Sequence, residues 1–477
     1  MFKKFRFVKV ILKSSLTLVV VSATMLVQAQ IGIGTTTPQA ILDVASTTSG
    51  LLIPRMTTVQ RNAIPSPPNG LQVYNISSNT TDIYRNGQWQ SVAYASLSAN
   101  LVYVNSLSDL PAPSGSSITL DANKMYIFSG FVNISPYYLN LNGAGLRGTD
   151  PGKDGVMSTI SGGVLRSSNV SVFIENLAVL PASAGTKAYD FADATGTMFC
   201  NLFSGCSVVE IGIPSLGVGQ VSGFNAITIA YNYWNCKDGI KVTGNVGKFA
   251  SAYNFITGIS SGCGIEFLSG LTINDIDLSN NYFIYTGQTG IKVNAGATIN
   301  RGRMTTNMYR GVTTYISGFD SYTPAWDMRQ NTYVPNSRAF SSVYMNTNTT
   351  LTSLPVVSTY YKVAGTTTSV SQKRFTASNN RLTYAGKDTI TAKVLVIIGA
   401  YAPNDLSSFS IAIAKNGIII STPNGTMAPT SNNQSFQITL ATELDMGTND
   451  YIEVFIKSNN SNSSSIKVDD LQFRVTD

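Results

Sequence analysis

Histidine is absent from all 477 residues of this chain. That absence excludes histidine-based catalytic triads, histidine metal ligands and histidine general bases. Charge is also sparse, because only 12% of the residues are Asp, Glu, Lys or Arg. Long stretches with the periodicity of an amphipathic helix are lacking, so a helical bundle is not expected.

The N-terminus concentrates positive charge that the rest of the chain lacks. Lys3, Lys4, Arg6, Lys9 and Lys13 precede the apolar run 16–27. Small residues at 27–29 suit signal peptidase, so residues 1–29 are predicted to be a cleaved signal peptide. The apolar run is too short for a spanning helix, and no transmembrane segment is expected after cleavage.

Removing the signal peptide lowers the formal net charge from +7 to +2. No basic cluster follows downstream, so nucleic acid is not an expected partner. What is abundant is Gly, Ser, Thr, Asn, Tyr, Ile and Val, the composition of strands and turns. We therefore predict an exported, all-β protein that works outside the cell.

A repeat gives the strongest evidence for the fold. Asn followed by two mostly large apolar residues recurs at intervals of 22 to 31 residues. The repeated residues are Asn201, Asn232, Asn254, Asn281 and Asn307. Such a period predicts a β-solenoid of about six or seven coils, with these side chains stacked as an Asn ladder at one corner.

A second marker keeps the same period. Gly-Ile-Lys-Val begins at Gly239 and again at Gly290, and Gly264 begins the related Gly-Ile-Glu-Phe. Apolar and polar residues alternate within each marker, as a half-buried strand requires. The predicted domains are an N-terminal module at 30–99, a right-handed parallel β-helix at 100–340 and a jelly-roll β-sandwich at 341–477.

Two segments resemble known families. The motifs at 32–38, 52–61 and 84–89 resemble the N-terminal module of surface and phage tail-fibre-like proteins of the Bacteroidetes group, except that Arg85 separates Tyr84 from Asn86. This resemblance implies an attachment or trimerisation collar. Residues 380–475 resemble the C-terminal knob of phage fibres, similar in outline to the tumour-necrosis-factor-like fold, which implies a homotrimer.

Parallel β-helices also occur in polysaccharide hydrolases and lyases, so paired carboxylates are relevant. Asp275 and Asp277 are spaced to project from one strand face, and Glu266 and Asp238 fall on neighbouring coils. The alternative, that these are solvated outward-facing positions, is the favoured interpretation. No metal site and no cofactor are predicted.

Four cysteines, Cys200, Cys206, Cys236 and Cys263, fall within the repeats. Export permits a disulfide, and Cys206 and Cys236 follow their Asn residues at similar offsets. Burial as small apolar side chains is the favoured alternative.

Binding residues are predicted in two places. Aromatic residues gather at 309–344, where Tyr322, Trp326 and Tyr333 are candidates for stacking on sugar rings. Burial at the end of the solenoid explains these aromatics equally well. Turns of the knob that contain Asn424 and Asn432 are the second prediction, because loops carry specificity while strands hold shape.

These features favour a non-enzymatic, homotrimeric adhesive fibre that binds a cell-surface glycan or a protein receptor. It would be secreted to the extracellular surface or built into a virion as a tail fibre. A tailspike-like polysaccharide hydrolase or lyase is the first alternative. A secreted structural surface protein of the bacterium itself is the second.

Overall fold

A computed structural model describes residues 30–92, 100–210, 212, 214–402, 407–420, 425–462 and 464–477. The predicted signal peptide lies outside these residues. The chain divides into two compact units, residues 1–97 and 98–477. Strands dominate both units, so the all-β prediction is confirmed.

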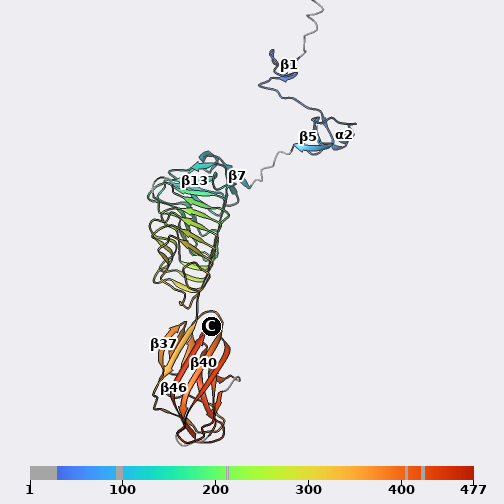
Figure 1. The fold of residues 1–477 in the computed structure, drawn as a ribbon. Helices are drawn as coiled ribbons and strands as arrows, with labels where there is room; N and C mark the ends of the chain where they lie inside the picture. Colours follow the sequence, from blue (N-terminus) through green and yellow to red (C-terminus); the bar gives the residue numbers. More distant parts are fainter. Residues whose placement is uncertain are drawn as a thin grey trace, which may run out of the picture. The chain divides into compact units, whose positions relative to one another are not determined.

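The second unit begins with a parallel β-solenoid (Figure 1). Each coil contributes one strand to each of three sheets, and most strands pair in parallel with the strand three places later. The solenoid has about nine coils rather than the predicted six or seven, since its sheets contain eight, nine and ten strands. The short 3-10 helix η2 (Leu107–Asp109) lies near its start.

The ten-stranded sheet contains β7 (Leu101–Val104), β9 (Met125–Phe128), β12 (Gly145–Arg147), β15 (Val172–Glu175), β18 (Phe199–Phe203), β21 (Ala226–Ala230), β24 (Asn245–Ala252), β27 (Thr272–Ser279), β30 (Thr298–Thr305) and β33 (Trp326–Arg329). The nine-stranded sheet contains β8 (Ser117–Thr119), β11 (Tyr138–Asn140), β14 (Gly162–Ser168), β17 (Thr186–Ala192), β20 (Gly219–Ser222), β23 (Ile240–Thr243), β26 (Cys263–Phe267), β29 (Thr289–Val293) and β32 (Thr314–Ser317). The eight-stranded sheet contains β10 (Phe131–Asn133), β13 (Gly155–Ser158), β16 (Ala178–Pro181), β19 (Ser207–Val209), β22 (Tyr233–Asn235), β25 (Phe255–Thr257), β28 (Tyr282–Ile284) and β31 (Met308–Arg310).

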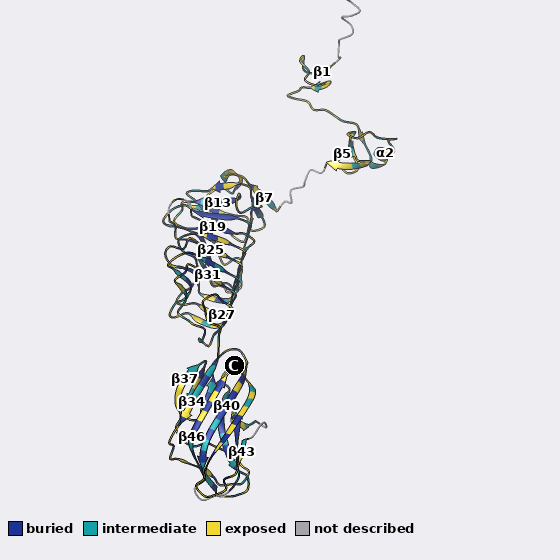
Figure 2. Cartoon of the chain, viewed as in Figure 1, coloured by how far each residue is buried: buried dark blue, intermediate teal, exposed yellow. Residues whose placement is uncertain are grey.

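Buried and exposed residues alternate along solenoid strands such as β22 and β31 (Figure 2). Ile240, Ile265 and Ile291 stack in register in the core. The glycine that precedes each of them is required by close packing. A Cβ atom at Gly239 would lie 1.9 Å from the carbonyl oxygen of Gly264. The Gly-Ile-Lys-Val marker thus records a steric requirement of the coil.

The second unit ends in a β-sandwich in which the chain passes repeatedly between two sheets, as in a jelly roll. One sheet contains β34 (Phe340–Met345), β35 (Leu351–Leu354), β37 (Thr368–Lys373), β40 (Ile390–Tyr401), β44 (Ser435–Met446) and β46 (Ser464–Thr476). The other contains β36 (Tyr361–Lys362), β38 (Phe375–Ser378), β39 (Arg381–Tyr384), β41 (Phe409–Lys415), β42 (Ile418–Ile419), β43 (Gly425–Met427) and β45 (Tyr451–Ser458). Their inner faces form one continuous apolar core.

The first unit is small. It contains β1 (Ile31–Ile33), β2 (Leu42–Val44), β3 (Arg55–Met56), α2 (Thr58–Asn62), β4 (Gln72–Asn75), β5 (Thr80–Arg85) and β6 (Gln88–Val92). Thr57 and Gln60 form a capping box that begins α2. Asp82 is fully buried, and its carboxylate accepts hydrogen bonds from Asn75 and Ser91 and pairs with Arg61.

Candidate functional site

The predicted Asn ladder is present in four of its five positions. Asn232, Asn254, Asn281 and Asn307 are buried, and each side-chain amide donates to the side-chain oxygen of the next at 2.9 to 3.1 Å. The last acceptor is Asn331, which the sequence pattern missed because no large apolar pair follows it. Each amide also donates to a backbone carbonyl of the preceding coil. The ladder is therefore structural.

Asn201 does not belong to this ladder. It lies within β18, where it pairs with Thr228 of the next coil. Cys206 occupies the ladder position instead, since the adjacent Ser207 pairs with Tyr233, the residue after Asn232. The sulfur of Cys206 lies 3.2 Å from the carbonyl oxygen of Ile174, the kind of acceptor that the ladder amides use. The true ladder position on this coil, Cys206, is therefore five residues after the predicted one, Asn201.

The candidate carboxylates Asp275 and Asp277 lie on the outer face of β27. Asp275 is in register with Lys248 and Arg301 on the two adjoining coils. Asp277 is in register with Arg303, whose guanidinium nitrogen lies 4.0 Å from its carboxylate. They line an open hollow of about 240 Å³. Cross-strand pairs of opposite charge stabilise a sheet, which explains both residues without catalysis.

Glu266 and Asp238 lie on the nine-stranded sheet side, away from the Asp275 strand. Glu266 is 9% exposed and accepts hydrogen bonds from Lys292 at 3.1 Å and Asn294 at 2.9 Å. Burial opposes its ionisation, but these two donors outweigh burial and lower the pKa of Glu266. Asp238 pairs with Lys241 and accepts backbone hydrogen bonds. An ionised, fully engaged carboxylate is a poor general acid.

All four cysteines are free and buried, so the structure contains no disulfide between Cys206 and Cys236. Burial raises the pKa of the Cys206 and Cys263 thiols to about 12. Burial also raises the pKa of Cys200 and Cys236 well above the ordinary range. Thiolates are the reactive form, so these side chains act as apolar packing groups.

The predicted aromatic residues near the end of the solenoid differ in how far they are buried. Trp326 is 2% exposed and stacks on Phe319 at 4.2 Å, so the burial alternative holds for it. Tyr322 is half-buried, and the Lys373 ammonium lies 4.3 Å from its ring centre. Tyr333 is 70% exposed, and one face of its ring stacks on Tyr315 with ring centres 5.2 Å apart.

A larger group of rings, four of them exposed and one half-buried, lies along the eight-stranded sheet. We call Tyr231, Tyr233, Tyr253, Phe255 and Tyr282 the aromatic stripe. Tyr233, Phe255 and Tyr282 are in register on β22, β25 and β28. Tyr231 stacks on Tyr253 with ring centres 5.0 Å apart and planes 1° apart, and Phe255 stacks on Tyr282 at 4.5 Å. Sequence reasoning missed this group because its members alternate with ladder and core residues.

The backbone of the aromatic stripe is unusual. Tyr231 and Tyr253 have φ angles of 59° and 55°, in the left-handed region that bulky residues avoid. Asn176 and Asn280 hold the corresponding turn position on other coils, where Asn tolerates this conformation. Tyr231 and Tyr253 remain 59% and 43% exposed. Strained residues of this kind cluster at binding sites.

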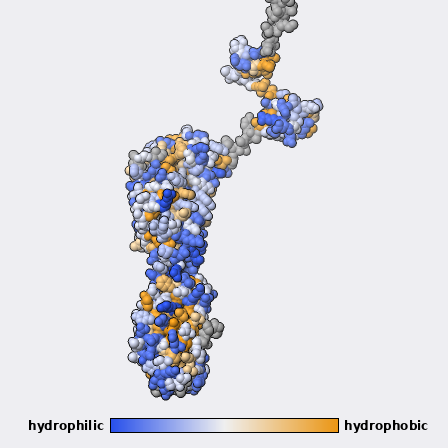
Figure 3. Space-filling view, viewed as in Figure 1, coloured by the Kyte–Doolittle hydropathy of each residue, from blue (hydrophilic) through white to orange (hydrophobic). Residues whose placement is uncertain are grey.

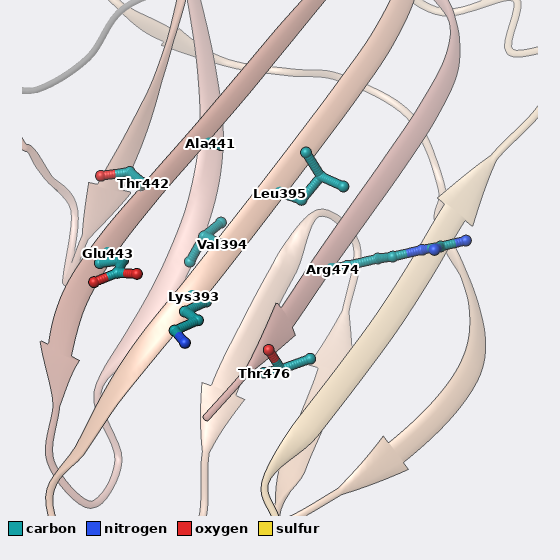
Figure 4. A pocket seen from close by; sticks show the side chains of 8 residues that line it. All are labelled: Lys393, Val394, Leu395, Ala441, Thr442, Glu443, Arg474 and Thr476. Atoms are coloured by element: carbon teal, nitrogen blue, oxygen red, sulfur yellow. The ribbon is translucent and has the colours of Figure 1, made fainter.

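The sandwich carries a shallow groove on the outer face of its β40, β44 and β46 strands (Figure 4). Its volume is about 510 Å³. Figure 4 shows the Arg474 side chain extending from β46 across the neighbouring strand. Apolar surface gathers over these sandwich strands in Figure 3. The lining residues are Lys393, Val394, Leu395, Ala441, Thr442, Glu443, Arg474 and Thr476.

The predicted knob loops contain Asn424 and Asn432. Asn432 is exposed in a turn, as a contact residue must be. Asn424 lies outside the described residues. Within the described ranges, no cluster of three or more potential ligands for a metal ion occurs. In the same ranges, no helix has both the length and the hydropathy needed to cross a membrane.

The first unit leaves much of its apolar surface uncovered. Val73 is its one fully buried apolar side chain among the described residues. Large apolar side chains elsewhere in this unit stand in solvent, and they include Ile31, Ile33, Ile41, Leu42, Leu51, Leu52 and Val59. A segment this short cannot bury them in a core of its own, so this apolar surface is available for contacts with other copies of the chain.

Comparison with known proteins bears on this segment. Residues 32–108 match the family described as the phage tail like trimerisation region. No curated protein is a significant sequence match to the chain. The family match indicates assembly as a homotrimer, in agreement with the resemblance of the N-terminal motifs.

Solved structures show only distant likeness. Tailspike protein 2 of Escherichia coli O157:H7 bacteriophage CAB120 is 11% identical, with a TM-score of 0.28 over 87% of this chain and 79% of that chain. Murine APRIL is 12% identical, with a TM-score of 0.20 over 28% of this chain and 98% of that chain. A family 35 carbohydrate binding module from Clostridium thermocellum is 12% identical, with a TM-score of 0.15 over 29% of this chain and 97% of that chain. These values carry no information about what this chain binds. Residues 32–108 are thus similar to a phage tail like trimerisation region, and they lie before and at the start of a parallel β-solenoid.

Proposed function

We propose that this protein is a homotrimeric receptor-binding protein of a phage tail that holds a cell-surface glycan without cleaving it. The aromatic stripe is the observation that carries the proposal. Its rings combine apolar area with hydroxyl groups, and tyrosine provides such contact area at a low cost in side-chain entropy. Saccharides present the same mixture of apolar ring faces and hydroxyls.

The hydroxyls of the stripe are available for a ligand. Among the described residues, the hydroxyl groups of Tyr231, Tyr233 and Tyr253 have no hydrogen-bond partner. The exposed position of the rings matches a receptor surface better than the buried Trp326 does. We therefore place the main glycan contact on the eight-stranded sheet, and keep Tyr333 and Asn432 as secondary candidates.

The surroundings of the four candidate carboxylates support binding rather than hydrolysis. Each of the four candidates is next to a cation on its own or an adjoining coil, and Glu266 is held ionised by its donors. Hydrolysis of a glycosidic bond needs one carboxyl group that stays protonated to act as the acid. Burial opposes ionisation of Glu266, the most buried of the four, but donation from Asn294 and Lys292 lowers its pKa, so it does not fit that role.

The trimer would be held at two places. Uncovered apolar residues of the first unit supply one contact, in the region that matches the trimerisation family. We assign the second contact to the groove of the sandwich around Leu395, because neighbouring copies are available there at high effective concentration once the first unit has assembled.

Tyr231→Asn/Tyr253→Asn is the variant that tests the stripe. Asn fits the left-handed turn, so unfolding temperature should stay within a few degrees while binding on a glycan array falls about tenfold or more. Light scattering of the same variant should still give a trimer. Loss of the trimer would instead make the stripe a subunit contact, and unchanged binding would refute its role.

A further inference from the structure

Three lysines from two coils meet at the corner where the chain passes from the eight-stranded to the nine-stranded sheet. Lys187 lies on β17, Lys241 lies on β23, and Lys237 follows β22. Together they line a hollow of about 280 Å³, which we call the lysine hollow. Its other lining residues are Ser215, Leu216, Gly219, Gln220, Asp238 and Ser261.

Two of the three lysines are paired with acids, and the third ammonium group is not. Lys187 pairs with Asp190 at 2.9 Å, and Lys241 pairs with Asp238. Within the described part of the chain, the ammonium group of Lys237 has no acidic partner. Glu210 lies close by, but its carboxylate accepts hydrogen bonds from Ser215 and from the Lys237 backbone rather than from the Lys237 ammonium group.

The hollow also offers neutral hydrogen-bonding groups. The Gln220 amide and the Ser261 hydroxyl line it, and neither side chain has a hydrogen-bond partner among the described residues. Lys237 lies four residues after Tyr233 of the aromatic stripe, so their Cα atoms are at most about 14 Å apart. A short oligosaccharide spans that distance.

We propose that the lysine hollow binds an anionic substituent of the glycan, a carboxylate, sulfate or phosphate group carried by a sugar next to the one on the aromatic stripe. This inference rests on the proposed glycan binding and names the chemical class of the glycan. A half-buried ammonium group beside polar neutral donors favours an anion over a neutral hydroxyl.

Binding constants test the inference with three anionic polymers and their neutral counterparts. The pairs are galacturonan and its carboxyl-reduced form, dextran sulfate and dextran, and phosphomannan and mannan, which distinguish the three anions. We expect at least one anionic member to bind about tenfold more tightly at low salt, and Lys187→Gln/Lys237→Gln to remove that preference. Lys248→Gln, on the ten-stranded sheet, is the matched control and should keep it. A preference that survives the double substitution would overturn the inference.

A second readout separates this inference from the proposed function. Acetylation of lysines in the intact trimer, followed by mass spectrometry, should show that the preferred anionic polymer protects Lys187 and Lys237 but leaves Lys248 reactive. Absence of protection at Lys237 refutes the lysine hollow even when the stripe variant shows that glycan binding depends on the stripe. Failure of all six polymers and of a glycan array to bind would refute the proposed function as well.

Discussion

At the scale of single residues, the Asn ladder links five consecutive coils through buried amides. Asn281 shows how many hydrogen bonds one ladder residue makes. Its amide donates to Ser251 and Asn307, and its oxygen accepts from Ser251 and Asn254. A ladder member therefore satisfies neighbours on both sides, and its loss leaves several buried groups without partners.

Replacement of Asn281 by Ala should lower the free energy of unfolding by about 3 kcal/mol, because buried donors and an acceptor lose their partners. Denaturant unfolding followed by circular dichroism measures this change. Asn201→Ala is the matched control, since Asn201 lies in a strand outside the ladder. Equal destabilisation by the two substitutions would contradict the ladder account.

The first ladder position predicts a stabilising substitution. The side-chain oxygen of Asn232 is buried without a partner in the described residues, because Cys206 has no amide to donate. Cys206→Asn would provide that donor and should raise stability by about 1 kcal/mol. Cys200→Asn should destabilise, because Cys200 lies within the core between Val172 and Ile227. A lower melting temperature for Cys206→Asn would refute this register.

At the scale of elements, the sequence predicted the coils wherever two markers repeat together. The glycine markers identify their strands because a Cβ atom at any of these positions would collide with the next coil. They are Gly239, Gly264 and Gly290. Earlier coils have Leu177 and Cys206 where Asn would stand, so the marker fails and two or more coils were missed. The aromatic stripe was hidden for a different reason, since its rings become neighbours only across coils.

The cross-strand neighbours of the candidate carboxylates also could not be predicted from the sequence. Asp275 and Asp277 were correctly predicted to share one strand face, but their cationic neighbours are 26 or 27 residues away in the chain. Sequence spacing of that size does not fix register to one residue. The lysine hollow could not be predicted for the same reason, because Lys187 and Lys237 are brought together only by the coil geometry.

The first unit should lose stability in acid. Burial opposes ionisation of Asp82, but hydrogen bonds from Ser91, Asn75 and Arg61 outweigh it and lower the pKa to about 2. Because the unfolded carboxyl titrates near 3.8, its contribution of about 2 kcal/mol is present above pH 4 and is lost as the pH falls toward 2.

Hydrogen exchange of residues 55–92 measures this loss. Protection should decrease between pH 4 and pH 2 beyond the intrinsic pH effect on exchange. Asp82→Asn should lower protection at neutral pH and flatten its pH dependence. A wild-type protein whose protection stays constant to pH 2 would contradict the role of Asp82.

At the scale of the whole molecule, the proposed trimer would cover the exposed apolar residues of the first unit. The mature protein, residues 30–477, should have about three times the monomer mass by light scattering at micromolar concentration. Leu395→Asp on the sandwich should weaken the trimer, whereas Lys248→Gln should not. A monomeric wild-type protein would refute the assembly.

Attachment without cleavage is the central claim. Its direct test incubates the protein with polysaccharide from cells that it binds, and measures bound protein and reducing ends in the same samples. The account predicts saturable binding, no increase in reducing ends, and unchanged binding for Asp275→Asn/Asp277→Asn. Reducing ends that accumulate with wild-type protein and disappear with Asp275→Asn/Asp277→Asn or Glu266→Gln would contradict it and establish a polysaccharide-cleaving enzyme.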